Sequence, residues 1–255
     1  MKIIRISSLI GIQEYGKVDH RPIDLLCGGK KEMTLSEAII HRHSVRQYEK
    51  RPIEEDLVSL LQKQIETCNQ EGNLSFQLVL NEPKAFQGFL PHYGGFKNVQ
   101  NYIALAGPDD DELDEKCGYF GERLVLFSES IGLSTCWVGG TFNKRAANLK
   151  MTSGDRLCLI ISIGYAALEG KPHRSKDESH FYPQSPDNPE WFVRGIHSAM
   201  LAPSAMNLQR FHFIYNKDDT VSASSGSGPF AKVDLGIAKL HFEIGSGRDH
   251  SVWAD

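Results

Sequence analysis

Three polar residues near the start of the chain alternate, because Arg42, Ser44 and Arg46 stand in the stretch "RHSVR". In an extended segment, alternate side chains point to the same side, so two guanidinium groups and one hydroxyl would share a face. Arginine binds anionic and planar groups through paired donors. The pattern therefore suits a ligand with a phosphate and a carbonyl-rich ring, and a solvated basic loop is the alternative interpretation.

A second polar stretch, "APSAMNLQ", lies about 155 residues later. Pro203 would end a helix, and a turn of small residues would let a flat ring approach the backbone. Asn207 and Gln209 would then offer amide donors and acceptors to that ring. The alternative is an ordinary turn, in which Ser204 and Asn207 make local bonds and Gln209 is exposed.

The stretch "GLSTCWVGG" places two glycines, Gly139 and Gly140, directly after an apolar strand-like piece. Glycine has no side chain to block a ligand from the backbone N–H groups. A loose turn explains the same pair without a ligand. The chain contains no GxSxG, HExxH or P-loop motif, so no protein nucleophile, zinc-protease base or nucleotide loop is indicated.

Composition limits the classes of function. The chain has 255 residues, of which 40% are hydrophobic and 24% charged, and its net charge of -4 does not favour a nucleic-acid partner. No apolar run approaches the roughly 18–20 residues of a membrane span. The cysteine number is odd and no CxxC pair occurs, which favours small buried thiols in a reducing compartment over disulfides or zinc ligands. We therefore expect a cytoplasmic protein without metal. The cysteines are Cys27, Cys68, Cys117, Cys136 and Cys158.

The elements that must position these stretches follow from periodicity and cap signals. Thr34 and Glu37 form the signature of a capping box, so we expect the fold to begin near Met33 and residues 1–32 to be a variable arm or an upstream translation product. Gly132 has the place of a left-handed helix cap. Helices are predicted over 34–41, 54–67, 111–131, 188–203 and 233–245, and strands over 75–80, 101–107, 157–166 and 211–215, with 157–166 central.

The second half of the chain repeats the first in weak form. In each half a helix leads through a turn containing Asn-Leu into a strand, and two later helices both end at Ile-Gly. The repetition predicts a long unit over 33–180 and a shortened unit over 186–255.

The ordered set "RHSVRQYEKRPI", "GLSTCWVGG", "IISIGYA" and "APSAMNLQ" resembles the nitroreductase family of FMN-dependent oxidoreductases, over about 34–175 and 186–245. The resemblance implies an α+β nitroreductase-like fold, in which a mixed or antiparallel sheet is flanked by helices. In the family, the Ala-Pro-Ser-Asn-Gln turn follows the Arg-Ser-Arg segment by 25–30 residues. Here that place holds "ETCNQEGNLSF", the intact turn lies at 202–209, and the proline after glutamine is replaced by Arg210.

Family members are usually homodimers with each flavin between two subunits. The displaced turn therefore suggests both halves fused in one chain, an internal pseudo-dimer with one FMN site and a monomeric state. By resemblance, Arg42 and Arg174 would hold the phosphate, with Lys171 and Lys176 as competing cations. Ser44 would bond the phosphate or ribityl chain, and Arg46 would face N1 and O2 of the ring. The remaining implied contacts are a backbone N–H of Gly139 or Gly140 to N5, Asn207 at the pyrimidine edge, and His43, Val138, Ser204 and Gln209 nearby.

The resemblance implies ping-pong transfer of hydride from NAD(P)H through the flavin to a small acceptor such as a nitroaromatic or quinone, without a catalytic side chain. Two alternatives stay open. One is an FMN-binding module without turnover, serving as a flavin store or sensor. The other is a related enzyme that fragments or dehydrogenates a specific substrate at the same site.

Overall fold

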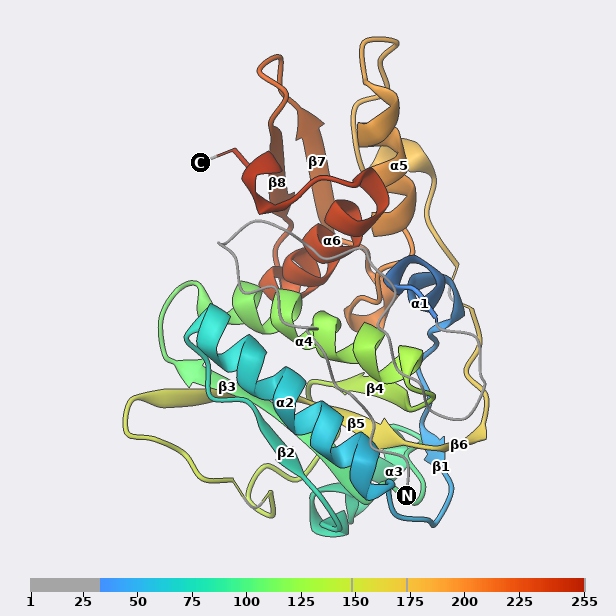
Figure 1. Ribbon diagram of the computed structural model, residues 1–255, viewed down its shortest axis with the longest axis vertical. Coiled ribbons are helices and arrows are strands. Elements are labelled where there is room, and N and C mark those ends of the chain that lie inside the picture. Colours follow the sequence, from blue (N-terminus) through green and yellow to red (C-terminus); the bar gives the residue numbers. More distant parts are fainter. Residues whose placement is uncertain (1–32, 148, 173, 255) are drawn as a thin grey trace, which may run out of the picture.

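The computed structural model describes residues 33–147, 149–172 and 174–254, so the expected arm at 1–32 lies outside the described residues. Helices and antiparallel strands mix along the chain (Figure 1). Up to residue 168 the elements are α1 (Leu35–His41), β1 (Gln47–Tyr48), α2 (Glu55–Gly72), β2 (Gln77–Val79), α3 (Phe89–Tyr93), β3 (Asn101–Pro108), α4 (Leu113–Ser130), β4 (Ser134–Val138), β5 (Asp155–Gly164) and β6 (Ala166–Leu168). Then follow α5 (Glu190–Ala199), β7 (Phe211–Tyr215), β8 (Val221–Ser225) and α6 (Ala231–Ser246).

The main sheet has four strands in the order β2-β3-β5-β4, and every neighbouring pair is antiparallel. β5 lies inside the sheet, and its residues from Cys158 to Gly164 are all buried. This confirms the prediction that the continuous apolar run is a central strand, because both of its faces are covered. Two-stranded sheets are formed by β1 with β6 and by β7 with β8.

Local signals explain the start of α1 and the end of α2. At α1, the Thr34 hydroxyl accepts from the Glu37 N–H at 3.2 Å and the Glu37 carboxylate accepts from the Thr34 N–H at 2.8 Å, so the capping box is confirmed. The prediction that α2 breaks at 67 is wrong. The helix continues to Gly72 because its end is made further on, where Asn73 adopts φ 52° and the Asn69 side chain bonds both backbone groups of Phe76.

Two parts of the chain have similar orders of elements. The series α2, β2, β3, α4 resembles the series α5, β7, β8, α6, although α3 lies between β2 and β3 without a counterpart between β7 and β8, and only the first series continues into β4 and β5. In Figure 1, α6 lies beside α4 in the middle of the molecule, between the four-stranded sheet and the β7–β8 hairpin. The division into two units stays a prediction.

The crossing of α4 and α6 is reciprocal. A Cβ built on Gly118 would lie 2.1 Å from the Val233 carbonyl oxygen, and one built on Gly236 would lie 2.0 Å from that of Glu115. Each glycine therefore meets the residue three positions before the other glycine, which is the form of a contact across a two-fold axis. The match of the two Ile-Gly ends is wrong, because Gly132 follows α4 at φ 83° whereas Gly245 is inside α6, which is capped by Gly247.

The described cysteines are free and buried, as the sequence predicts, and Cys27 lies outside the described residues. Burial raises the pKa of the Cys68 thiol to about 11, which keeps it a protonated, inert group. Among the residues that the structure places, no helix has both the length and the apolar character that a membrane crossing requires.

Candidate functional site

The Arg42–Arg46 segment is extended and lies along β4. The Val45 N–H donates to the Thr135 carbonyl at 2.9 Å, and Ser44 and Thr135 form a parallel bridge. Val45 is buried, and Arg42, Ser44 and Arg46 alternate with it.

The buried thiol of Cys136 is a reference point for the three polar side chains. Burial raises its pKa, while the charge of Arg46, a hydrogen bond with Ser44 and the charge of Arg42 act in the opposite direction. All three groups are therefore within interaction range of one thiol. The shared face of the three side chains stays a prediction, since Arg42 is buried and Arg46 is exposed.

Arg42 has an unsatisfied donor. The residue is only 7% exposed, and its Nε is buried without a hydrogen-bond partner among the described residues. Its charge also acts on Glu129, whose pKa is raised chiefly by burial and lowered by Arg42. A buried guanidinium N–H without an acceptor is costly. This donor is therefore a place where an oxygen of a ligand would fit.

Gly139 and Gly140 differ in the space beside their backbone. Val138 ends β4 and is buried. A Cβ on Gly139 would lie 2.5 Å from the tip of the Phe230 ring, whereas a Cβ on Gly140 would have nothing within 4 Å. A flat group can therefore reach the backbone at Gly140, as the sequence interpretation requires.

The turn that contains Asn207 is held by its own side chains. Met206, Asn207 and Gln209 all have positive φ, between 47° and 55°. The Asn207 amide donates to the Arg174 carbonyl at 3.0 Å and accepts from the Gln209 amide at 2.7 Å. These amides were predicted to contact a ligand, but here they bond to protein.

Gln209 is fully buried, so its predicted exposure in the ordinary-turn interpretation is wrong. Its Oε1 accepts from the Lys176 N–H at 2.9 Å, its Nε2 donates to the Arg174 carbonyl at 2.8 Å, and its own N–H donates to the Ser204 hydroxyl at 3.0 Å. Gln209 is thus a clamp between this turn and residues 174–176. Such contacts join positions 33 residues apart or more, and local sequence does not reveal them.

Residues 170–172 and 174–176 contact the two groups of predicted site residues. At one end, a Cβ on Gly170 would lie 2.5 Å from the Cβ of His43. At the other end, the Arg174 carbonyl accepts from the turn, and the Lys176 ammonium donates to the Leu208 carbonyl at 2.6 Å. Of the three candidate phosphate cations, Lys176 is already bound, while Arg174 and Lys171 are exposed.

The first turn of α6 contributes two residues that the sequence analysis missed, Phe230 and Asp234. Both oxygens of the Asp234 carboxylate accept from the Ala205 N–H, at 2.9 and 3.1 Å, while the Phe230 ring contacts Gly139. One helix end therefore touches both the turn and the glycine pair. An acid inside the apolar run "VDLGIAKL" was the available signal for Asp234.

Asp234 makes stability depend on pH. Burial raises the pKa of this carboxyl to about 7, although the Ala205 hydrogen bond lowers it. The folded state therefore holds the proton more tightly than the unfolded chain. The resulting stabilisation is complete below about pH 4 and is lost as pH rises through about 7, at about 1.4 kcal/mol per pKa unit.

Asp234→Asn keeps an oxygen acceptor for Ala205 and cannot ionise. We expect its melting temperature to rise relative to the parent protein between pH 5 and pH 8, with the smallest difference at pH 4. Thermal unfolding at these three pH values measures the trend. Asp110→Asn makes the same charge change at an exposed loop acid and is the control. Parallel pH curves for Asp234→Asn and the parent would contradict the assignment.

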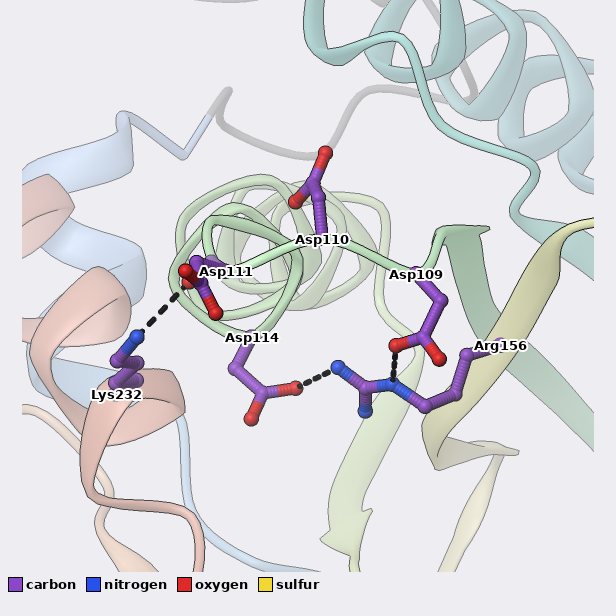
Figure 2. Close-up of a pocket in the computed structure, with 6 residues that line it drawn as sticks. All are labelled: Asp109, Asp110, Asp111, Asp114, Arg156 and Lys232. Carbon is purple, nitrogen blue, oxygen red and sulfur yellow. Dashed lines mark hydrogen bonds and ion pairs between the residues drawn. The ribbon is translucent and has the colours of Figure 1, made fainter.

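A separate hollow lies at the start of α4 and is bordered by Lys232 from the first turn of α6 (Figure 2). Asp114 and Asp109 both bind Arg156, the first at 3.0 Å, and the Lys232 ammonium donates to the Asp111 carbonyl at 2.9 Å. Asp110 points away from the other side chains in the view. The cations are thus already bound to neighbouring oxygens, which agrees with the acidic run being a solvated helix start.

Comparisons with known proteins identify the class. The family model described as "Putative TM nitroreductase" matches residues 34–246. A crystal structure described as a "putative nitroreductase" from Thermotoga maritima is 22% identical, covers 87% of this chain and 87% of its own, and has a TM-score of 0.62. A search of the curated proteins gives no match.

Two further solved structures are similar over part of the chain. An "FMN-dependent Nitroreductase" from Clostridium difficile is 21% identical and covers 54% of this chain and 90% of its own, with a TM-score of 0.43. A nitroreductase described in complex with FMN, from Desulfovibrio desulfuricans, is 17% identical over 57% and 94%, with a TM-score of 0.46.

Because the family model spans most of the sequence, the chain belongs to this nitroreductase family. Its α+β fold is nitroreductase-like, so the fold class expected from the motifs is confirmed. The individual residue roles stay predictions.

Proposed function

We propose that the chain is an FMN-dependent oxidoreductase that passes hydride from NAD(P)H to a nitroaromatic, a quinone or a similar acceptor. The buried Arg42 Nε without an acceptor carries the proposal, because an anionic oxygen is the group that this donor lacks. Gly140 supports it, since its open side leaves room for a ring against the backbone. When bound, FMN would supply the two-electron redox chemistry.

The chain's own residues would bind and orient the cofactor. Arg42, with Arg174 or Lys171, would hold the phosphate, and Ser44 would bond the phosphate or the ribityl chain. Arg46 would place a cation by the ring, and Gly140 would offer a backbone N–H. Asn207 and Gln209 fit a supporting role better than direct contact, because their amides already bond to Arg174.

We further propose an internal pseudo-dimer with units over 33–180 and 186–255 and one FMN site per chain. The reciprocal contact of Gly118 and Gly236 and the similar order of elements support it. The second unit has no counterpart of β4 and β5 among the described elements, so it offers no second glycine pair at that place. A monomer in sedimentation experiments is the expected state.

The first experiment is the visible spectrum of the purified protein, followed by release and quantification of flavin. One FMN per chain, bleached by NADH or NADPH, is the expected result. Flavin that binds but is not reduced would favour the store or sensor alternative. Two FMN per chain would overturn the single-site arrangement, and a protein that neither contains nor takes up FMN would overturn the proposal.

Arg42→Ala is expected to weaken FMN binding about 10- to 100-fold, because one charge-assisted hydrogen bond contributes about 1.5–3 kcal/mol. Titration of flavin fluorescence measures the dissociation constant. Arg42→Lys keeps the charge but loses the Nε donor, so it should recover only part of the affinity. Arg194→Ala, which removes an exposed arginine on α5, is the control and should bind FMN normally.

A further inference from the structure

Phe230 brings an aromatic ring from the second part of the chain to the glycine pair of the first. The Phe230 atoms Cζ, Cε2 and Cε1 lie 2.5, 2.7 and 3.0 Å from a Cβ built on Gly139. These atoms form the tip of the ring, so the ring meets the glycine end-on. Gly140 has no such neighbour.

The backbone of Phe230 is unusual. Its φ of 64° lies in the left-handed region, where a bulky side chain is a genuine outlier. Such conformations persist where the surroundings impose them, and they concentrate at functional sites. Here the conformation turns the chain into α6, and the Asp234 N–H donates to the Phe230 carbonyl at 2.8 Å.

The loop before Phe230 is tied down by Arg210, the residue that replaces the family's proline. The Arg210 guanidinium donates to the Ser227 carbonyl at 2.6 Å, and the Gly226 N–H donates to the Arg210 carbonyl at 2.7 Å. The departure in the turn therefore has a structural consequence, because it fixes the loop that delivers Phe230.

From this placement we propose that Phe230 is the specificity-determining wall of the acceptor site, a role that rests on the proposed flavin function. The phenyl ring of Phe230 is planar and apolar, so it packs favourably against flat aromatic molecules and offers them no polar hydrogen bond. Since it closes the Gly139 side, Phe230 limits the bulk of the acceptor that can lie over the glycine pair. Planar acceptors of a single ring are favoured over larger ones.

Phe230→Ala tests the wall. We expect kcat/KM for menadione to rise about tenfold relative to that for p-benzoquinone, since added room in an apolar pocket changes discrimination by about this factor. The visible circular dichroism of bound FMN should also change, because the ring environment loses an aromatic neighbour. Phe230→Leu keeps apolar bulk and should give a smaller change in both measurements.

A second pair of variants locates the effect. Gly139→Ala would drive a methyl group into the Phe230 ring, so it should weaken FMN binding, and Gly139→Ala combined with Phe230→Ala should restore it. Gly140→Ala has open space, so its effect should be the same with or without Phe230.

The outcomes separate the two proposals. If the parent protein binds FMN but Phe230→Ala leaves the acceptor ratio and the dichroism unchanged, the wall is overturned and the flavin function stands. If no variant binds FMN, both fail. If FMN binds only after Phe230→Ala, the ring obstructs the cofactor itself and the wall is again overturned.

Discussion

Gly118→Ala is expected to lower the free energy of unfolding by about 3 kcal/mol, although alanine is the better helix former. The new methyl group would lie 2.1 Å from the Val233 carbonyl oxygen. Neither side can yield cheaply, because both are helix backbone. Gly236→Ala meets the Glu115 carbonyl in the same way and should cost a similar amount.

Urea unfolding of the parent protein, Gly118→Ala and Gly236→Ala measures these losses in the free energy of unfolding. The double variant should lose less than the sum of the single losses, since either methyl group alone already separates α4 from α6. Gly140→Ala makes the same chemical change in open space and should shift stability by no more than about 0.5 kcal/mol. An unchanged urea midpoint for Gly118→Ala would contradict the close crossing.

Local patterns predicted the elements well because their causes are local. The capping box at Thr34, the left-handed Gly132 and the buried run of β5 each depend on neighbours a few residues away. The end of α2 was predicted too early, since it depends on Asn69 bonding to Phe76 rather than on the polarity of the stretch. Composition alone is a weak guide to a helix end.

The candidate site likewise contains residues that local sequence patterns indicate and residues that only distant contacts reveal. The alternation of Arg42, Ser44 and Arg46 is a local property that the sequence shows directly, and the roles of these side chains stay predictions. Phe230 and Asp234 were missed because their importance arises from contacts with Gly139 and Ala205. No periodicity in the sequence encodes which helix end will face a glycine pair 91 residues earlier.

The second large effect concerns a buried pair at the centre of the molecule. The Glu122 carboxylate and the His241 Nε2 are 2.9 Å apart, and both side chains are fully buried. Glu122 also accepts from the Trp137 indole at 2.8 Å, and His241 Nδ1 lies 3.2 Å from the Ser198 carbonyl. The pair therefore joins α4, β4, α5 and α6.

Both ring nitrogens of His241 lie within hydrogen-bond distance of an oxygen atom, one from the Glu122 carboxylate and one from the Ser198 carbonyl. Removing one partner leaves a buried polar group without its match. His241→Ala is accordingly expected to lower the free energy of unfolding by about 3–5 kcal/mol. Urea unfolding at pH 7 measures it.

An exposed pair of the same composition is the control. His197 and Glu178 are 3.0 Å apart, but their side chains are 53% and 39% exposed. His197→Ala should cost at most about 1 kcal/mol, because water replaces the lost partner. Equal losses for His197→Ala and His241→Ala would show that burial does not govern the central pair.

Replacing both members of the buried pair distinguishes two contributions to the free energy of unfolding. One is the cost of leaving one buried polar group without its partner, and the other is the net stabilisation from the pair itself. Glu122→Met with His241→Phe removes both ionisable side chains of the pair, although Trp137 and Ser198 each lose a partner. We expect this double variant to be more stable than either single variant, since apolar groups of similar volume often replace a buried ion pair at little cost. A loss equal to the sum of the single losses would contradict this expectation, because additive losses mean that the two side chains contribute independently and that their contact has no coupling energy. If the double variant also retains one FMN per chain, the buried pair supports the fold without setting the flavin site.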